Sequence, residues 1–167
     1  MTISPAEQRS IQTGWAAAIA GPASRWSALP LRLILGYGFL AHGYAKLTRG
    51  PETFATVLQI LGVPAPFFLA WATTLVELIG GAAVLVGAFI PIVSVPLATV
   101  LLAAMFTVHL RYGFFSVKLA EVSENGVKFG TVGYEIILLY LAALLSLVIS
   151  GAGALSIDGW RKRANDK

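Results

Sequence analysis

The chain contains four apolar segments, each about as long as a membrane-spanning helix. A helix needs about 20 mainly apolar residues to cross the hydrocarbon core of a bilayer. The segments that qualify run over 29–47, 67–90, 91–110 and 131–150. Of the 167 residues, 57% are hydrophobic and only 12% are charged, which is more apolar than a water-soluble domain of this size. The sequence therefore predicts an all-α integral membrane protein, a four-helix bundle forming a single domain.

The two longer connections between these segments differ in what they predict. In residues 48–66, apolar side chains recur at helical spacing, which predicts a short helix lying in the membrane interface between the first two spans. Its apolar face consists of Phe54, Val57, Leu58 and Leu61. Residues 111–130 mix charged side chains with phenylalanines. We expect this connection to rest against lipid headgroups, but its conformation is not predicted.

Positive charge at the ends of the chain predicts its orientation in the membrane. Lys and Arg are enriched on the cytoplasmic side of short flanking segments, and residues 161–163 form a dense basic cluster. We therefore predict a cell (inner) membrane protein with both termini in the cytoplasm. The layout is a polar segment 1–28, a membrane domain 29–160 and a basic tail 161–167. The apolar run 15–20 is too short for a signal-peptide core, so no cleavage is expected.

Two functional classes are excluded by composition. The chain has no cysteine, which removes thiolate nucleophiles, disulfide exchange and Cys-ligated clusters. The formal net charge is +4, but the basic residues sit at helix ends and termini and form no stripe along one face. We therefore expect no binding to nucleic acid.

Six ionisable side chains fall within the predicted spans, where each costs roughly 2.5–3.5 kcal/mol to insert. They are Arg32, His42, Lys46, Glu77, His109 and Glu135. Helical geometry puts the three on the first span within an arc of roughly 80°. The topology brings His42, Lys46, His109 and Glu135 toward the outer surface, with Glu77 deeper. The sequence thus predicts a polar site inside the bundle that opens toward the outer leaflet.

Each of these residues also has a structural interpretation. Arg32 and Lys46 lie near helix ends, from which long side chains reach the headgroups, and His109 ends a span. Glu77 is the strongest functional candidate, because a carboxylate in mid-membrane must be protonated or paired. Two histidines and two glutamates also leave haem or metal ligation open, although their spacing is diagnostic of neither. No metal site is predicted, and non-covalent haem is not excluded.

The order and spacing of these residues resemble the DoxX family of small four-helix membrane proteins over roughly residues 29–160. The matching features are Arg32, Gly36, Phe39, His42-Gly43, Lys46-Leu47, Phe54, Leu61-Gly62-Val63-Pro64, Glu77, Gly80-Gly81, Gly87, His109, Gly113-Phe114, Glu135, Gly151-Ala152-Gly153 and Leu155-Ser156-Ile157-Asp158. The family is named for a subunit associated with a terminal quinol oxidase. Its DoxD-like relatives form part of a thiosulfate:quinone oxidoreductase, and other members are linked to redox complexes that handle oxidative stress.

The resemblance implies a redox partner at the membrane, with quinone as the small molecule. A quinone that takes up two electrons also takes up two protons, so His and Lys would donate to its carbonyl oxygens and Glu77 or Glu135 would relay protons. We assign catalytic roles to Glu77, His42 and Glu135, and quinone binding to these three with Arg32, Lys46 and His109. Lys46 and Arg111 would attract an anionic electron donor such as thiosulfate.

Three hypotheses remain open from the sequence. The first is a quinone-binding membrane subunit of an oxidoreductase. The second is a non-catalytic anchor or assembly subunit, whose outer loop around Phe114 and Phe115 docks a partner. The third is a small proton-coupled transporter, since Glu and His inside a bundle also mark ion routes. The expected partners are the lipid bilayer, quinone, and either other subunits of a redox complex or further copies of the chain.

Overall fold

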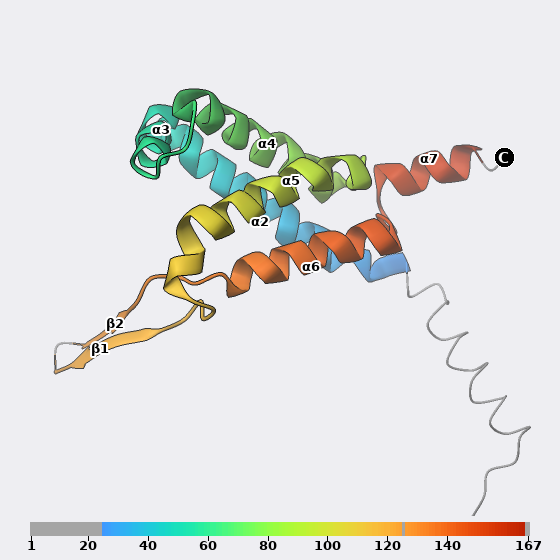
Figure 1. Ribbon diagram of the computed structural model, residues 1–167. Helices are drawn as coiled ribbons and strands as arrows, with labels where there is room; N and C mark the ends of the chain where they lie inside the picture. Colours follow the sequence, from blue (N-terminus) through green and yellow to red (C-terminus); the bar gives the residue numbers. More distant parts are fainter. Residues whose placement is uncertain (1–24, 125, 166–167) are drawn as a thin grey trace, which may run out of the picture.

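The structure is a computed structural model that describes residues 25–124 and 126–165 (Figure 1). It is mostly helical. Its α-helices are α2 (Ala28–Arg49), α3 (Pro51–Ile60), α4 (Pro66–Val86), α5 (Ile90–Ala104), α6 (Glu135–Ser150) and α7 (Ile157–Asn165). Helix α5 continues through a π-helical turn, η2 (Met105–His109), and a 3-10 turn, η3 (Leu110–Tyr112). Most of the predicted N-terminal segment, including the apolar run 15–20, lies outside the described residues.

Helices occupy all four predicted spans, and a short helix follows the first of them. Helix α3 confirms the helical prediction for 48–66, while its position at a lipid interface stays a prediction. Helix α4 ends at Val86, before the predicted boundary at 90, because Gly87 adopts φ 68°, a left-handed conformation that stops a helix. Helix α5 then begins at Ile90 with Pro91 in its first turn, where the missing N–H costs nothing.

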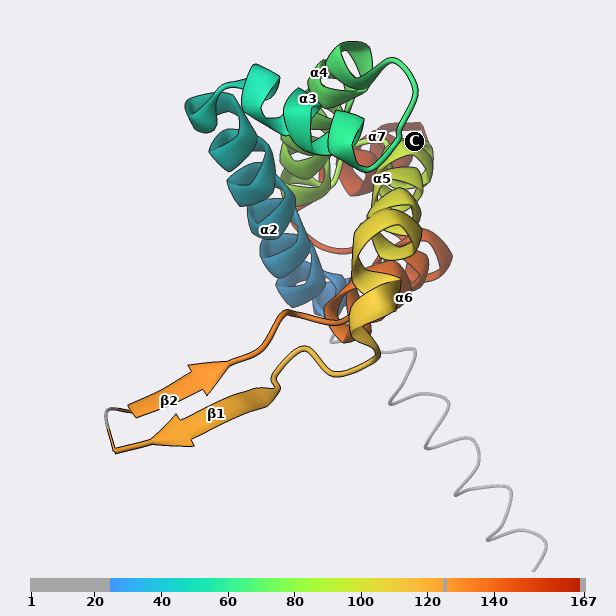
Figure 2. The same cartoon turned by 60° about the vertical axis from the view of Figure 1, so that its left-hand side comes forward.

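The four longer helices contact one another in a closed order: α2 packs on α4, α4 on α5, α5 on α6, and α6 on α2 (Figures 1 and 2). Their contact buries an apolar core in which several side chains are at most 2% exposed. These are Leu35, Phe39, Val84, Ile90, Leu97, Leu144 and Leu147. Helices α2 and α4 approach most closely at two glycines. A Cβ atom on Gly36 would lie 2.8 Å from the Leu85 backbone nitrogen, and one on Gly81 would lie 2.9 Å from the Leu40 nitrogen.

Within the described residues, two helices are long and apolar enough to cross a membrane: α4, and the continuous helix from Ile90 to Tyr112. Large apolar side chains on both remain exposed, including Ile79 at 66% and Ile92 at 69%. Exposed apolar surface on this scale is expected where a helix faces lipid or a partner. Helix α6 is apolar but shorter. Crossing by α2 and α6, and the orientation of the termini, stay predictions.

The connection between α5 and α6, whose conformation the sequence did not predict, forms a β-hairpin in an otherwise helical fold. Strand β1 (Leu119–Ser123) pairs antiparallel with β2 (Gly126–Phe129), and Val122 lies opposite Val127 (Figure 2). The overlooked signal is the pair Asn125-Gly126, since Asn-Gly between β-branched and charged residues is a strong hairpin signal. All strand residues are exposed, including the charged Glu121 and Lys128. Contact of this connection with lipid headgroups stays a prediction.

The C-terminal part of the chain folds back onto the turn between α4 and α5. Gly151 ends α6 with φ 80°, a backbone conformation that glycine adopts without strain. Both carboxylate oxygens of Asp158, in the first turn of α7, accept backbone N–H groups, at 2.9 Å from Phe89 and 3.1 Å from Ile90. Asp158 thereby attaches helix α7 to the start of α5. Helix α7 runs across the predicted boundary between membrane domain and basic tail at residue 160.

Candidate functional site

The contact between α2 and α4 brings two predicted site residues together as an ion pair. Lys46 Nζ lies 2.5 Å from Glu77 Oε1. Glu77 is 5% exposed, whereas the Lys46 side chain keeps 20% of its surface exposed. The carboxylate is therefore buried, and the side chain of its partner Lys46 reaches the surface.

Glu77 belongs to a stripe of otherwise small or apolar residues on the buried face of α4. Ala70, Thr74, Gly81 and Val84 share this face with it, at the three- and four-residue spacing of one side of a helix. The neighbouring hydroxyl is already used, because Thr74 Oγ1 donates to the Ala70 carbonyl at 2.7 Å. The Thr74 hydroxyl therefore does not donate to Glu77, whose hydrogen-bond partner is Lys46 on α2.

Only one oxygen of this carboxylate is satisfied. Glu77 Oε2 is buried and has no hydrogen-bond partner among the described residues. A buried polar atom left without a partner costs about 1–3 kcal/mol, and such atoms are rare in folded proteins. The free oxygen is thus a position at which a proton or the donor group of a ligand would be stabilised.

Helix α3 adds an aromatic side chain to the pair. Lys46 Nζ lies 4.8 Å from the centre of the Phe54 ring, close enough for a cation–π interaction. Sequence reasoning placed Phe54 only on an apolar helix face, because nothing in the sequence says how α3 folds back over the end of α2. The resulting cluster of Lys46, Glu77 and Phe54 combines a cation, a carboxylate with one free oxygen, and an aromatic ring.

His42 lies one helical turn before Lys46 on α2. Its side chain is exposed, and it makes no hydrogen bond or ion pair within the described residues. It therefore has both ring nitrogens available to a ligand or to a partner chain.

The two other residues predicted at the outer end, His109 and Glu135, hold the junction between α5 and α6. His109 Nδ1 lies 3.0 Å from the Val132 carbonyl oxygen, a hydrogen-bond distance. Glu135 Oε2 accepts the Ser116 N–H at 3.0 Å. No hydrogen bond or ion pair in the described part of the chain links them to Lys46 or Glu77. In Figures 1 and 2 the end of α2, with α3, lies apart from the end of α5.

Arg32 stands apart at the opposite end of α2, about 20 Å along the helix axis from Lys46 at ~1.5 Å per residue. It is 1% exposed. Its guanidinium group donates to backbone carbonyls at the end of α4 and in the segment after α6. The acceptors are Val84 and Leu85, and Ala152, Ala154 and Leu155, at 2.8–3.3 Å. All five N–H donors of the side chain are used, so Arg32 joins three segments and has no donor left for a cofactor.

The described residues place no group of three His, Asp or Glu side chains so that it could hold a metal ion. The arrangement at the end of α2 offers an ammonium donor and an unpartnered carboxylate oxygen for hydrogen bonds. A carboxylate beside an ammonium group can exchange protons with a bound molecule, and the adjacent phenyl ring suits a flat apolar ligand.

Two long apolar helices with exposed apolar side chains indicate a membrane protein. Residues 27–110 match the family model described as DoxX, and the chain belongs to this family of membrane proteins. The matched segment contains the whole Lys46, Glu77 and Phe54 cluster and stops before the hairpin.

Two curated proteins are similar to the chain. The Bacillus subtilis protein named "Putative oxidoreductase CatD" is 37% identical over 86 residues, which are 52% of this chain and 62% of that protein. The Haemophilus influenzae protein named "Uncharacterized protein" is 28% identical over 130 residues, 77% of this chain and 85% of its own length. The chain thus spans less than two thirds of the Bacillus protein. No solved structure matches it significantly.

Proposed function

We propose that the chain is a membrane subunit of a quinone-linked oxidoreductase and that quinone binds against the Lys46–Glu77 pair. The observation that carries this proposal is the buried Glu77 Oε2, which has no partner among the described residues. Membership of the DoxX family and the name of the Bacillus relative support a link to redox chemistry. The bilayer would supply quinone directly to a site between membrane helices.

In this proposal the protein supplies hydrogen bonds and protons, and the electrons come from elsewhere. Reduction of a quinone to a quinol takes two electrons and two protons, one proton on each carbonyl oxygen. Lys46 has three N–H donors and gives one to Glu77 Oε1, so another can donate to a quinone oxygen. Glu77 passes protons through Oε2. The electrons come from a partner electron-transfer subunit or from a small anionic donor such as thiosulfate.

The remaining predicted residues take different places in the proposal. His42, exposed one turn from Lys46, is a second donor at the rim of the site. Phe54 stacks against the quinone ring as well as holding Lys46. His109 and Glu135 keep the α5–α6 junction in shape and do not contact quinone.

The test is the quinone content of the purified protein. The protein would be purified in mild detergent from quinone-containing membranes, extracted with organic solvent, and assayed for quinone per chain. We expect bound quinone in the wild type, loss of most of it in Glu77→Gln, and no loss in Glu121→Gln, which removes the same charge from an exposed ion pair. Wild-type quinone content and quinone-linked turnover in Glu77→Gln would contradict the proposal. An absorption spectrum of the same sample would reveal haem.

A second function, a docking or assembly subunit, is favoured by the hairpin. Its strands carry large apolar side chains that no described element covers: Leu119, Val122, Val127 and Phe129. An exposed apolar strand pair suits a partner chain. Purification from native membranes tests this function. A partner that co-purifies with the wild type and is lost when residues 117–129 are replaced by a short Gly-Ser linker would support it, and an unchanged set of partners would argue against it.

A further inference from the structure

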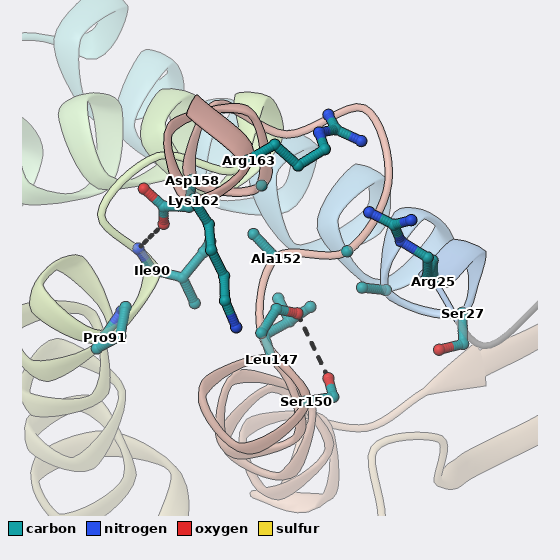
Figure 3. Close-up of a pocket in the computed structure, with 14 residues that line it drawn as sticks. Arg25, Ser27, Ile90, Pro91, Leu147, Ser150, Ala152, Asp158, Lys162 and Arg163 are labelled. Carbon is teal, nitrogen blue, oxygen red and sulfur yellow. Dashed lines mark hydrogen bonds between the residues drawn. The ribbon is translucent and has the colours of Figure 1, made fainter. Parts of the chain in front are cut away.

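At the end of the molecule opposite α3, a pocket of about 510 Å³ opens between the start of α5, the end of α6 and helix α7 (Figure 3). It is separate from the Lys46–Glu77 pair, which does not line it. Pockets of roughly this size hold small ligands in many proteins. The residues that line this pocket indicate which kind of ligand.

Positive charge dominates the rim. Arg25, Lys162 and Arg163 line the pocket together with one acid, Asp158. Both oxygens of that acid already accept backbone N–H groups at the start of α5. Figure 3 shows Lys162 extending toward Leu147 and Ser150. Three cations therefore share the described pocket lining with a single carboxylate, and none of them forms an ion pair with it.

The inner wall is apolar. Ile90, Leu147 and Ala152 line it and are each at most 6% exposed. These residues stand where two apolar helices end, which is the depth of lipid headgroups if those helices span the bilayer. Basic pockets at the ends of membrane helices bind anionic headgroups. The cationic rim suits a phosphate group, and the apolar wall suits the acyl chain of the molecule that carries it.

The backbone holds this rim in place. Ala154 N–H donates to the Arg25 carbonyl at 2.6 Å, which fixes the loop after α6 against the segment before α2. Gly153 makes this approach possible, because a Cβ atom there would lie 2.5 Å from the Arg25 carbonyl oxygen. Arg25 thus stands on a different segment from Lys162 and Arg163 but is fixed beside the same pocket.

We propose that this pocket binds a phosphate group through Arg25, Lys162 and Arg163, with the headgroup of an anionic phospholipid favoured over free phosphate by the apolar wall. The site would tie α7 to the bilayer surface and stabilise the folded helices. It does not depend on quinone binding, so either proposal can fail while the other holds.

The test compares ligands and variants of the full chain in detergent. Thermal unfolding would be followed while phosphatidylglycerol, phosphatidylcholine or inorganic phosphate is titrated in. Lys162→Gln and Arg25→Gln each remove one rim charge. The matched control is Arg161→Gln, which removes one positive charge from the same helix as Lys162. Arg161 does not line the pocket, and its guanidinium group lies 5.0 Å from the centre of the Phe89 ring.

We expect phosphatidylglycerol to stabilise the wild type and Arg161→Gln equally, and to bind roughly fivefold more weakly to Lys162→Gln and to Arg25→Gln. Phosphatidylcholine should have little effect. Stabilisation by inorganic phosphate that is lost in the same two variants would support the site with free phosphate as its ligand. Equal weakening by all three substitutions, or no preference for phosphatidylglycerol over phosphatidylcholine, would overturn the proposal. Arg25→Gln keeps the test valid if Lys162→Gln does not fold.

Discussion

Arg32 and Glu77 are both charged residues buried among helices, yet their surroundings differ in kind. Arg32 is 1% exposed and gives all five of its N–H donors to carbonyls. Glu77 is 5% exposed, pairs through one oxygen with Lys46, and leaves the other without a partner among the described residues. One group is fully satisfied by the fold, and the other is half satisfied.

This difference in hydrogen bonding distinguishes a buried charge that stabilises the fold from one that is available to a ligand. A fully satisfied buried cation fixes the segments that satisfy it and has nothing left to offer a ligand. A half-satisfied carboxylate stays in a costly state unless a proton or a ligand completes it. Sequence reasoning grouped both residues in one site, whereas the structure assigns Arg32 to the scaffold. Four variants test this contrast.

Arg32→Lys should have the largest effect on stability. Lysine has three donors in place of five, so at least two carbonyls lose a charge-assisted hydrogen bond worth about 1.5–3 kcal/mol each. We expect the free energy of unfolding to fall by about 3–6 kcal/mol, measured by denaturation in detergent. A variant as stable as the wild type would show that the five contacts do not hold the fold.

Gly36→Ala should be the next most severe. The added methyl group would meet the Leu85 backbone nitrogen at 2.8 Å, so α2 and α4 must separate, at a cost of about 1–3 kcal/mol. The separation should also weaken the Lys46–Glu77 pair and lower the quinone content. Ala41→Val, at an exposed position of the same helix, is the control and should change neither quantity.

Replacing the pair by apolar residues should affect function more than stability. Lys46→Met combined with Glu77→Leu removes both charges and the unpartnered oxygen. Such replacements of buried ion pairs are often neutral or stabilising, whereas removing one partner is not. We expect the double variant to unfold within about 1 kcal/mol of the wild type, to be more stable than either single variant, and to lack quinone-linked turnover. Turnover in the double variant would place the chemistry elsewhere.

Glu121→Gln should have the smallest effect. Its partner Lys128 lies 2.8 Å away on the hairpin, and the two side chains are 55% and 74% exposed. Exposed ion pairs contribute about 0–1 kcal/mol and weaken with salt. Denaturation at low and high ionic strength should show a loss below about 1 kcal/mol that disappears at high salt. A larger loss would indicate that the hairpin is buried against something in the measured sample.

The helices were predictable because hydrophobic length and helical spacing are local properties of the sequence. The end of α4 at Gly87 and the hairpin were missed, although Gly87 and Asn125-Gly126 are both recognisable signals for a turn. The pairing of Lys46 with Glu77 depends on how α2 and α4 rotate against each other, which the close approach at Gly36 and Gly81 sets.

Two features of the sites were beyond sequence reasoning. The partners of Arg32 are backbone carbonyls, which every residue carries, so no residue type marks them. The position of Phe54 over Lys46 depends on the direction in which α3 leaves Gly50, whose φ of 83° turns the chain. Buried charge could be located in the sequence, but what satisfies it could not.

The most direct test is the quinol affinity of Glu77→Gln and Arg32→Lys, measured side by side on proteins purified from a quinone-free host. With quinol added under anaerobic conditions, at a temperature where both variants are folded, we predict roughly tenfold weaker binding to Glu77→Gln, as expected when the hydrogen bond from a quinol hydroxyl to the carboxylate oxygen loses its charge. Arg32→Lys should bind like the wild type despite its lower stability. Wild-type affinity in Glu77→Gln, or a loss confined to Arg32→Lys, would contradict the division between a reactive and a structural charge.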